Sequence, residues 1–172
     1  MATRSTIALE FADGTVQQVY CHWDGYLSNN GRILQNNYSD PIKAGSLIEL
    51  GDISTLGPEI GEKHSFDNPH KYGTDEYFAE QVRRQEFTTF YGRDRGETGC
   101  EARRYENYED YCKSAEFEAY NYILRSDGQW YVSKGCFPRM SLTETLAVEV
   151  QEEEEWISSK IGVLFGIMKN PN

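Results

Sequence analysis

The chain has 172 residues and a formal net charge of −11, from 17 Lys and Arg against 28 Asp and Glu. This length fits one domain, residues 1–172, and leaves little room for a second. So acidic a chain is poorly suited to binding a nucleic-acid backbone, because proteins bind that backbone largely through cationic side chains that displace its counterions. We therefore expect no direct nucleic-acid contact, and a protein partner with a basic surface.

Four widely spaced cysteines form no C-x-x-C pair, and the first residues run into a predicted strand without a signal peptide. The longest apolar stretch, residues 161–168, is far shorter than the roughly 20 residues that cross a bilayer. We expect a reduced cytoplasmic protein, in the host cell if the gene is phage-encoded, with no membrane segment and no cofactor.

The first half of the chain predicts a hairpin and two helices. Strand formers alternate in residues 5–11 and 15–21 around a tight Asp-Gly turn. Asn29 and Asn30 predict the cap of a short helix that ends near Tyr38. The pair Asp40-Pro41 predicts the start of a second helix that ends at Gly51.

The second half begins with a loop. Residues 57–74 contain Gly and Pro but few apolar residues, so we expect a long mobile loop. A helix is expected over 75–84, a strand over 86–91, a helix capped by Asn107 that ends near residue 117, and a second hairpin over 119–133.

Ser141 and Glu144 form a capping-box pattern at the start of a last helix. Its predicted apolar face consists of Leu142, Leu146, Val150, Ile157 and Ile161. Together these elements predict a single α+β domain with a mainly antiparallel sheet of about five strands and several packed helices.

Two short polar-aromatic runs follow predicted strands and are the main candidates for a binding site. Loops that leave strands are where a rigid scaffold presents functional side chains. The candidate residues for ligand or partner binding are His22, Trp23, Asp24 and Tyr26 in the first run, and Tyr91, Arg93, Asp94 and Arg95 in the second. We expect both runs to leave neighbouring strands at one end of the sheet and to form one site.

The arginines around the second run allow two interpretations. Between residues 83 and 104 six Arg face four acidic residues, a local excess of +2. Arg93 and Arg95 could hold a phosphate or carboxylate, with Trp23 stacked on a base. Alternatively, they form an internal salt-bridge network that ties a loop to the acidic surface. The second interpretation is favoured, because acidic chains usually pair their arginines in this way.

Other groupings give weak support for catalysis. Cys21 and His22 are adjacent in a strand and should point to opposite faces. Cys100 lies near two arginines that would lower its pKa, but no histidine is evident beside it. His64 and His70 match no metal-ligand spacing and are interpreted as part of a solvated loop. We therefore expect no metal site and no catalytic residues, and a binding protein rather than an enzyme.

The last predicted helix carries an acidic face that is a second candidate interface. On a solvated amphipathic helix such a face is ordinary, but a row of carboxylates could also imitate nucleic-acid phosphates. Its residues are Glu149, Glu152, Glu153 and Glu155.

Four segments carry a resemblance: residues 3–7, 20–26 (YCHWDGY), 50–54 and 90–97 (FYGRDRGE). Together they resemble a group of small uncharacterised bacteriophage and prophage proteins. The resemblance implies a class of function and no residue-level mechanism. Its members would bind a host protein or complex and inhibit or redirect it, in an anti-defence or host-takeover role. The alternative is a nucleotide-binding sponge or nucleotide-processing enzyme that uses Trp23, Arg93 and Arg95.

Overall fold

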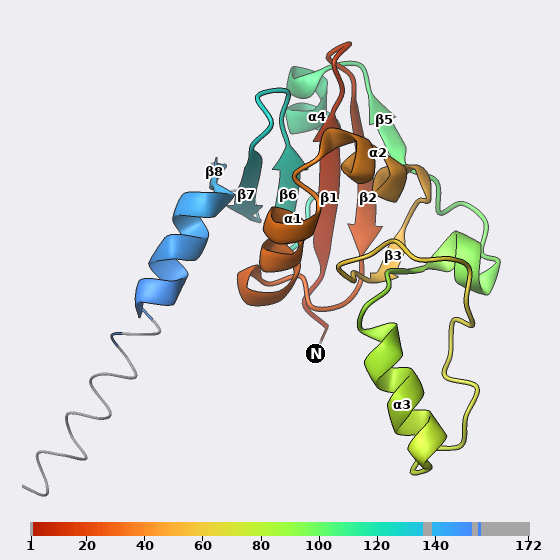
Figure 1. Ribbon diagram of the computed structural model, residues 1–172. Coiled ribbons are helices and arrows are strands. Elements are labelled where there is room, and N and C mark those ends of the chain that lie inside the picture. Colours follow the sequence, from red (N-terminus) through yellow and green to blue (C-terminus); the bar gives the residue numbers. More distant parts are fainter. Residues whose placement is uncertain (1, 136–138, 153–154, 156–172) are drawn as a thin grey trace, which may run out of the picture.

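A computed structural model describes residues 2–135, 139–152 and 155. Its core is a mixed sheet with the strand order β4-β3-β2-β1-β6-β7-β8, and β5 pairs with β2 (Figure 1). The strands are β1 (Ser5–Glu10), β2 (Val16–Cys21), β3 (Ile53–Thr55), β4 (Thr89–Phe90), β5 (Arg103–Tyr105), β6 (Tyr120–Leu124), β7 (Trp130–Lys134) and β8 (Met140–Ser141).

The predicted fold class is confirmed, although the part of the chain that the structure describes has eight strands rather than about five. The pairs β1–β6 and β2–β3 are parallel, and the other pairs are antiparallel. The extra strands β3, β5 and β8 have two or three residues each, too short to show an alternating pattern in the sequence.

Both predicted Asp-Gly hairpins are confirmed. β1 pairs with β2 from Ser5 opposite Cys21 to Glu10 opposite Val16, and β6 pairs with β7. In each turn the Asp side chain accepts a hydrogen bond from the backbone two residues later, as when Asp13 Oδ1 accepts from the Thr15 N–H at 3.0 Å. The Asp therefore stabilises the turn itself.

The helical elements of the described residues are η1 (Leu27–Gly31), α1 (Arg32–Asn37), α2 (Pro41–Glu49), α3 (Asp75–Arg84), η2 (Tyr91–Arg95), α4 (Tyr108–Ser114) and residues 142–152. η1 and η2 are single π-helical turns. The bounds of α3 match the prediction, and Asp40 and Asn107 cap α2 and α4 as expected.

Other predicted boundaries were wrong. Helical structure begins at Leu27 without a side-chain cap, so Asn29 and Asn30 lie inside η1. The strand expected over residues 86–91 is reduced to β4, because the Glu86 and Phe87 N–H groups donate back to the end of α3 and the chain turns into η2 at Tyr91. α4 ends at Ser114, three residues before the expected end.

In the last helix, Glu144 N–H lies 3.4 Å from Ser141 Oγ, as the capping box requires. Leu142 is buried and Leu146 packs on the core, but Val150 is 39% exposed and does not belong to the apolar face. Ile157 and Ile161 lie outside the described residues.

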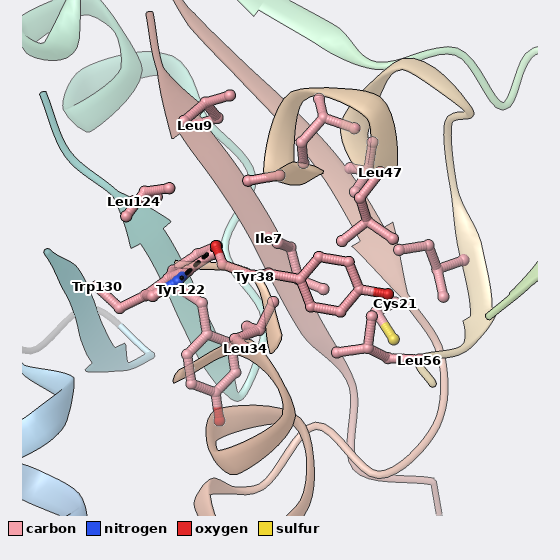
Figure 2. Packing of buried hydrophobic residues seen from close by; sticks show 14 of the residues in the cluster. Ile7, Leu9, Cys21, Leu34, Tyr38, Leu47, Leu56, Tyr122, Leu124 and Trp130 are labelled. Atoms are coloured by element: carbon pink, nitrogen blue, oxygen red, sulfur yellow. Dashed lines mark hydrogen bonds between the residues drawn. The ribbon is translucent and has the colours of Figure 1, made fainter. Parts of the chain in front are cut away.

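Two apolar clusters cover the two faces of the sheet. Because side chains alternate along a strand, Ile7 and Leu9 point into the larger cluster, with α1 and α2, and Ala8 points into the smaller one, with α4. Figure 2 shows Trp130 and Tyr38 in the larger cluster, where Trp130 Nε1 donates to the Tyr38 carbonyl at 3.1 Å. Trp130 thus satisfies its indole N–H inside the core.

Candidate functional site

The first polar-aromatic run continues β2 beyond its last residue. Residues 21–26, here the Trp23 loop, follow β3 for two more hydrogen bonds, from the His22 and Trp23 N–H groups to the Ile53 and Ser54 carbonyls, both at 3.0 Å. Asp24 then has a φ of +54°, a left-handed conformation that Asp tolerates better than most residues. The loop therefore turns sharply away from the sheet.

Gly25 fits the tightest point of this turn. A Cβ atom there would lie 2.8 Å from the Arg4 carbonyl carbon, and the Gly25 N–H donates to the Thr3 carbonyl at 2.8 Å. Any larger residue would push the Trp23 loop off the start of the chain. The glycine of this run thus serves close backbone packing rather than ligand approach.

Asn30, fully buried in η1, holds the Trp23 loop from inside. Its Nδ2 lies 3.2 Å from Ser5 Oγ, 3.4 Å from Cys21 Sγ and 3.2 Å from the Trp23 carbonyl. Its backbone N–H donates to the Asp24 carbonyl at 3.3 Å. Such a buried polar network fixes one backbone conformation. This role of Asn30 could not be predicted, because nothing in the local sequence pattern distinguishes Asn30 from Asn29.

On this fixed backbone the aromatic side chains remain open to solvent. Trp23 is 44% exposed and Tyr26 is 39% exposed. The His22 ring stands edge-on to Trp23, with centroids 4.7 Å apart, and Tyr20 Oη lies 2.7 Å from His22 Nδ1. Trp23 is therefore not a core residue, and the Trp23 loop presents an aromatic surface on a fixed backbone.

The second run is mainly structural. Arg93 Nε donates to Asp94 at 2.8 Å, and Nη1 donates to the Ile60 and Gly61 carbonyls at 3.0 and 2.8 Å. Nη2 donates to the Thr88 carbonyl at 2.8 Å and to Asp94 at 3.0 Å. Because all five N–H groups of a guanidinium are thereby engaged, none is free for a phosphate.

Asp94 is the acceptor at the centre of this arrangement, and its side chain is fully buried. Burial alone would raise its pKa, but the hydrogen bonds from Arg93 and from the Phe90 and His64 N–H groups outweigh burial and lower it. His64 Nε2 lies 3.1 Å from Thr89 Oγ1. We call Arg93, Asp94 and His64 the loop clamp, because together they fasten residues 60–64 to β4.

The solvated-loop interpretation of His64 was therefore wrong, since its side chain is 9% exposed. Arg95 also turns toward the loop: its guanidinium lies 4.8 Å from the Phe66 ring centroid and 3.2 Å from Glu97. The internal network that the sequence analysis favoured accounts for both arginines. Arg95 nevertheless keeps 54% of its side chain exposed.

The two runs leave the sheet in opposite directions. β3 lies between β2 and β4, parallel to β2 and antiparallel to β4. The Trp23 loop and η2 therefore begin at the same level of the sheet, where Cys21, Ile53 and Phe90 lie in register, and run in opposite directions. At this level the Tyr91 N–H donates to the Asp52 carbonyl at 3.1 Å, and the Trp23 N–H donates to the Ser54 carbonyl at 3.0 Å. The expectation of one shared site was wrong for Arg93.

The acidic candidates lie on the last helix. Glu149 is half-buried, Glu152 and Glu155 are exposed, and Glu153 falls outside the described residues. Val148, 56% exposed, lies beside them. Over its described residues, the outer surface of this helix is therefore mixed rather than a continuous row of carboxylates.

Two of the three cysteines that the structure describes, Cys21 and Cys100, have unreactive environments. Burial raises the pKa of Cys21 to about 12. Burial and the nearby carboxylates of Glu97, Asp52 and Glu101 raise the pKa of Cys100, so the expectation that neighbouring arginines lower it was wrong. Cys112 is exposed.

Within residues 2–135, 139–152 and 155, no cluster of His, Cys, Asp and Glu has the arrangement of a metal site. No helix in this part of the chain has the length and apolar character needed to span a membrane. Comparison of the chain with protein-family models, curated proteins and solved structures finds no match in any of the three. The site must therefore be interpreted from its own geometry.

Proposed function

We propose that this chain is a bacteriophage-type accessory protein that binds and inhibits or redirects a host protein or complex in the host cytoplasm. The observation that carries the proposal is Trp23, 44% exposed on a backbone that the buried Asn30 holds in place. Aromatic side chains supply much of the binding energy at protein interfaces, and a rigid loop loses little entropy on binding.

The charge of the chain indicates the kind of partner. At −11, the molecule attracts a basic surface at long range, which raises the association rate and makes that rate sensitive to salt. In this proposal the Trp23 loop contributes the short-range contacts, and acidic residues such as Glu152 and Glu155 contribute attraction. Imitation of nucleic-acid phosphates by these carboxylates is one way in which the chain would attract a basic partner.

The alternative, a nucleotide sponge or nucleotide-processing enzyme, has less support. Arg93 already uses its N–H groups in the loop clamp, so a phosphate there would have to break buried hydrogen bonds. Only Trp23 and Arg95 of the proposed set keep exposed side chains. We therefore favour a protein partner.

Affinity purification from bacterial lysate with quantitative mass spectrometry tests the proposal. We compare the wild type with Trp23→Ser and with Ile42→Ser, an exposed apolar residue on α2 that serves as control. A stoichiometric partner should be captured by the wild type and by Ile42→Ser but lost by Trp23→Ser. With the purified partner, salt should slow association.

Two results would overturn the host-binding proposal. One is the recovery of no stoichiometric protein that depends on Trp23. The other is a thermal shift of the wild type by nucleotides or cyclic oligonucleotides that Arg95→Ala abolishes, which would favour the alternative. A saturating ligand at a hundred times its Kd stabilises a protein by about 2.7 kcal/mol, a shift that is readily measured.

A further inference from the structure

A groove of about 760 Å³ runs along one side of the last helix, residues 142–152. Figure 1 shows this helix, in blue, leading from β8 away from the sheet. Met140 of β8 and Leu27 of η1 line the groove from the sheet side. On the helix side the lining residues recur every three or four positions and therefore form one stripe. The stripe begins at the capping residue Ser141 and continues through Glu144, Thr145, Val148, Glu149 and Glu152. We call this groove the Val148 groove.

Apolar side chains face the Val148 groove with little cover from the described residues. The last helix is attached to the core through Leu142 and Leu146, which lie in its first two turns. Val148, further along the helix, is 56% exposed, and Met140 is 50% exposed. A segment with apolar side chains would remove both of them from water.

Glu149 gives the groove a second requirement. The Oε2 atom of its carboxylate is buried and has no hydrogen-bond partner within residues 2–135, 139–152 and 155. A buried carboxylate oxygen without a donor is costly, and a cation or an N–H group removes that cost. Lys134 lines the groove but lies 5.4 Å from the Tyr120 ring centroid, and Arg139 likewise lies 4.8 Å from the Tyr111 ring centroid. The occupant of the groove should therefore bring a donor of its own.

The rest of the chain matches both requirements. Residues 156–172 lie outside the described residues, and they follow Glu155, about one turn beyond the end of the groove at Glu152. They contain the longest apolar stretch of the sequence, residues 161–168, with Lys160 and Lys169 at its two ends and no acidic residue. Their net charge is +2, whereas residues 141–155 carry six Glu and no cation. The segment is therefore complementary to the groove in charge as well as in apolar character.

We propose that residues 160–169 of the same chain turn back and occupy the Val148 groove as a second helix, antiparallel to the last one. The apolar stretch then covers Val148, and Lys160, which follows the turn, supplies the cation that Glu149 lacks. Lys169 lies at the other end of the groove.

The lengths of the two segments agree with this arrangement. From Ser141 to Glu152 the stripe is about 17 Å long, and residues 160–169 in a helix span about 15 Å. Residues 156–159 remain for the turn, within the roughly two to eight residues that usually connect packed helices. So short a connection gives the segment a high effective concentration at its own groove, which favours the same chain over a second copy. The arrangement does not depend on the host-binding proposal, since it concerns a different surface.

Nuclear Overhauser spectra of the full chain with labelled methyl groups test the apolar contact. Cross-peaks are expected between the Val148 methyl groups and the methyl groups of residues 161–168. Ile42, exposed on α2, is the control and should give no cross-peak with those residues. A Val148 without cross-peaks to residues 161–168 would overturn the proposal. Cross-peaks that arise only between differently labelled copies in a mixed sample would also overturn it, because the occupant would then be a second copy.

A charge exchange tests the pairing of Lys160 with Glu149. Lys160→Glu and Glu149→Lys, each alone, should accelerate amide hydrogen exchange of residues 144–152 about fivefold, because like charges then meet in the groove. The double variant should restore the protection of the wild type. Lys63→Glu, the same change at an exposed loop residue, is the control and should leave the exchange of residues 144–152 unaltered. A double variant that exchanges as fast as the single variants, or a Lys160→Glu variant that behaves as Lys63→Glu does, would exclude this arrangement.

Discussion

Arg93 and Asp94, adjacent in the sequence, form a two-point ion pair, with Nε to Oδ1 at 2.8 Å and Nη2 to Oδ2 at 3.0 Å. Neighbouring side chains rarely face each other, and the turn η2 makes this possible. Asp94 is fully buried and Arg93 nearly so. The pair fastens the loop after β3 to β4, and its removal should loosen that side of the molecule first.

Asp94→Asn should lower the free energy of unfolding by about 3 kcal/mol, because it leaves the Arg93 guanidinium buried without its counter-charge. Urea denaturation measures the change. Glu97→Gln is the matched control: its pair with Arg95 is solvent-exposed, so the expected change is below about 1 kcal/mol. Equal effects of the two substitutions would show that the loop clamp adds no stability.

The loop clamp should also make stability depend on pH. The pKa of Asp94 is lower in the folded protein than in the unfolded chain, where an Asp titrates near about 3.9. Its contribution is therefore complete above that value and is lost as pH falls through the folded pKa. The difference in unfolding free energy between wild type and Asp94→Asn should shrink below about pH 4. A difference that stays constant from neutral pH down to pH 3 would contradict this assignment.

Asn30→Ala should destabilise the protein by about 1 to 3 kcal/mol, since buried partners such as Ser5 Oγ and the Trp23 carbonyl lose their donor. The Trp23 loop should become more mobile, and near-ultraviolet circular dichroism should record this. Asn37→Ala, which removes one half-buried hydrogen bond to Ile33, is the control and should have a smaller effect. An unchanged near-ultraviolet circular dichroism spectrum of Asn30→Ala would show that the Trp23 loop keeps its conformation without Asn30.

Thiol alkylation should distinguish the cysteines. In the native state at neutral pH, Cys112 should react readily, because its side chain is exposed. Cys21, fully buried with a pKa of about 12, should react only after unfolding in urea. Cys100, with its raised pKa, should react more slowly than Cys112. Mass spectrometry of the alkylated peptides measures each rate, and native labelling of Cys21 at the rate of Cys112 would be inconsistent with the core around it.

Local patterns predicted the elements whose causes are local. The Asp13 and Asp127 turns, the Asp40 and Asn107 caps and the bounds of α3 each depend on residues within a few positions of one another. The start of η1 was missed, because it begins without a side-chain cap. The sequence predicted both polar-aromatic runs of the candidate site, but not how they lie relative to each other in the fold.

By itself, the sequence determined the α+β class, the two hairpins, the charge and the residue types at the strand ends, since alternation, turn chemistry and composition are properties of neighbouring residues. Only the tertiary structure decided that Trp23 is exposed, that Arg93 is engaged, and that the two runs leave the sheet in opposite directions. Those outcomes depend on the direction of β3 between β2 and β4 and on contacts such as Arg93 with Ile60, 33 positions away. Pairing direction and long-range contact arise from packing of the whole chain, which no short window of sequence contains.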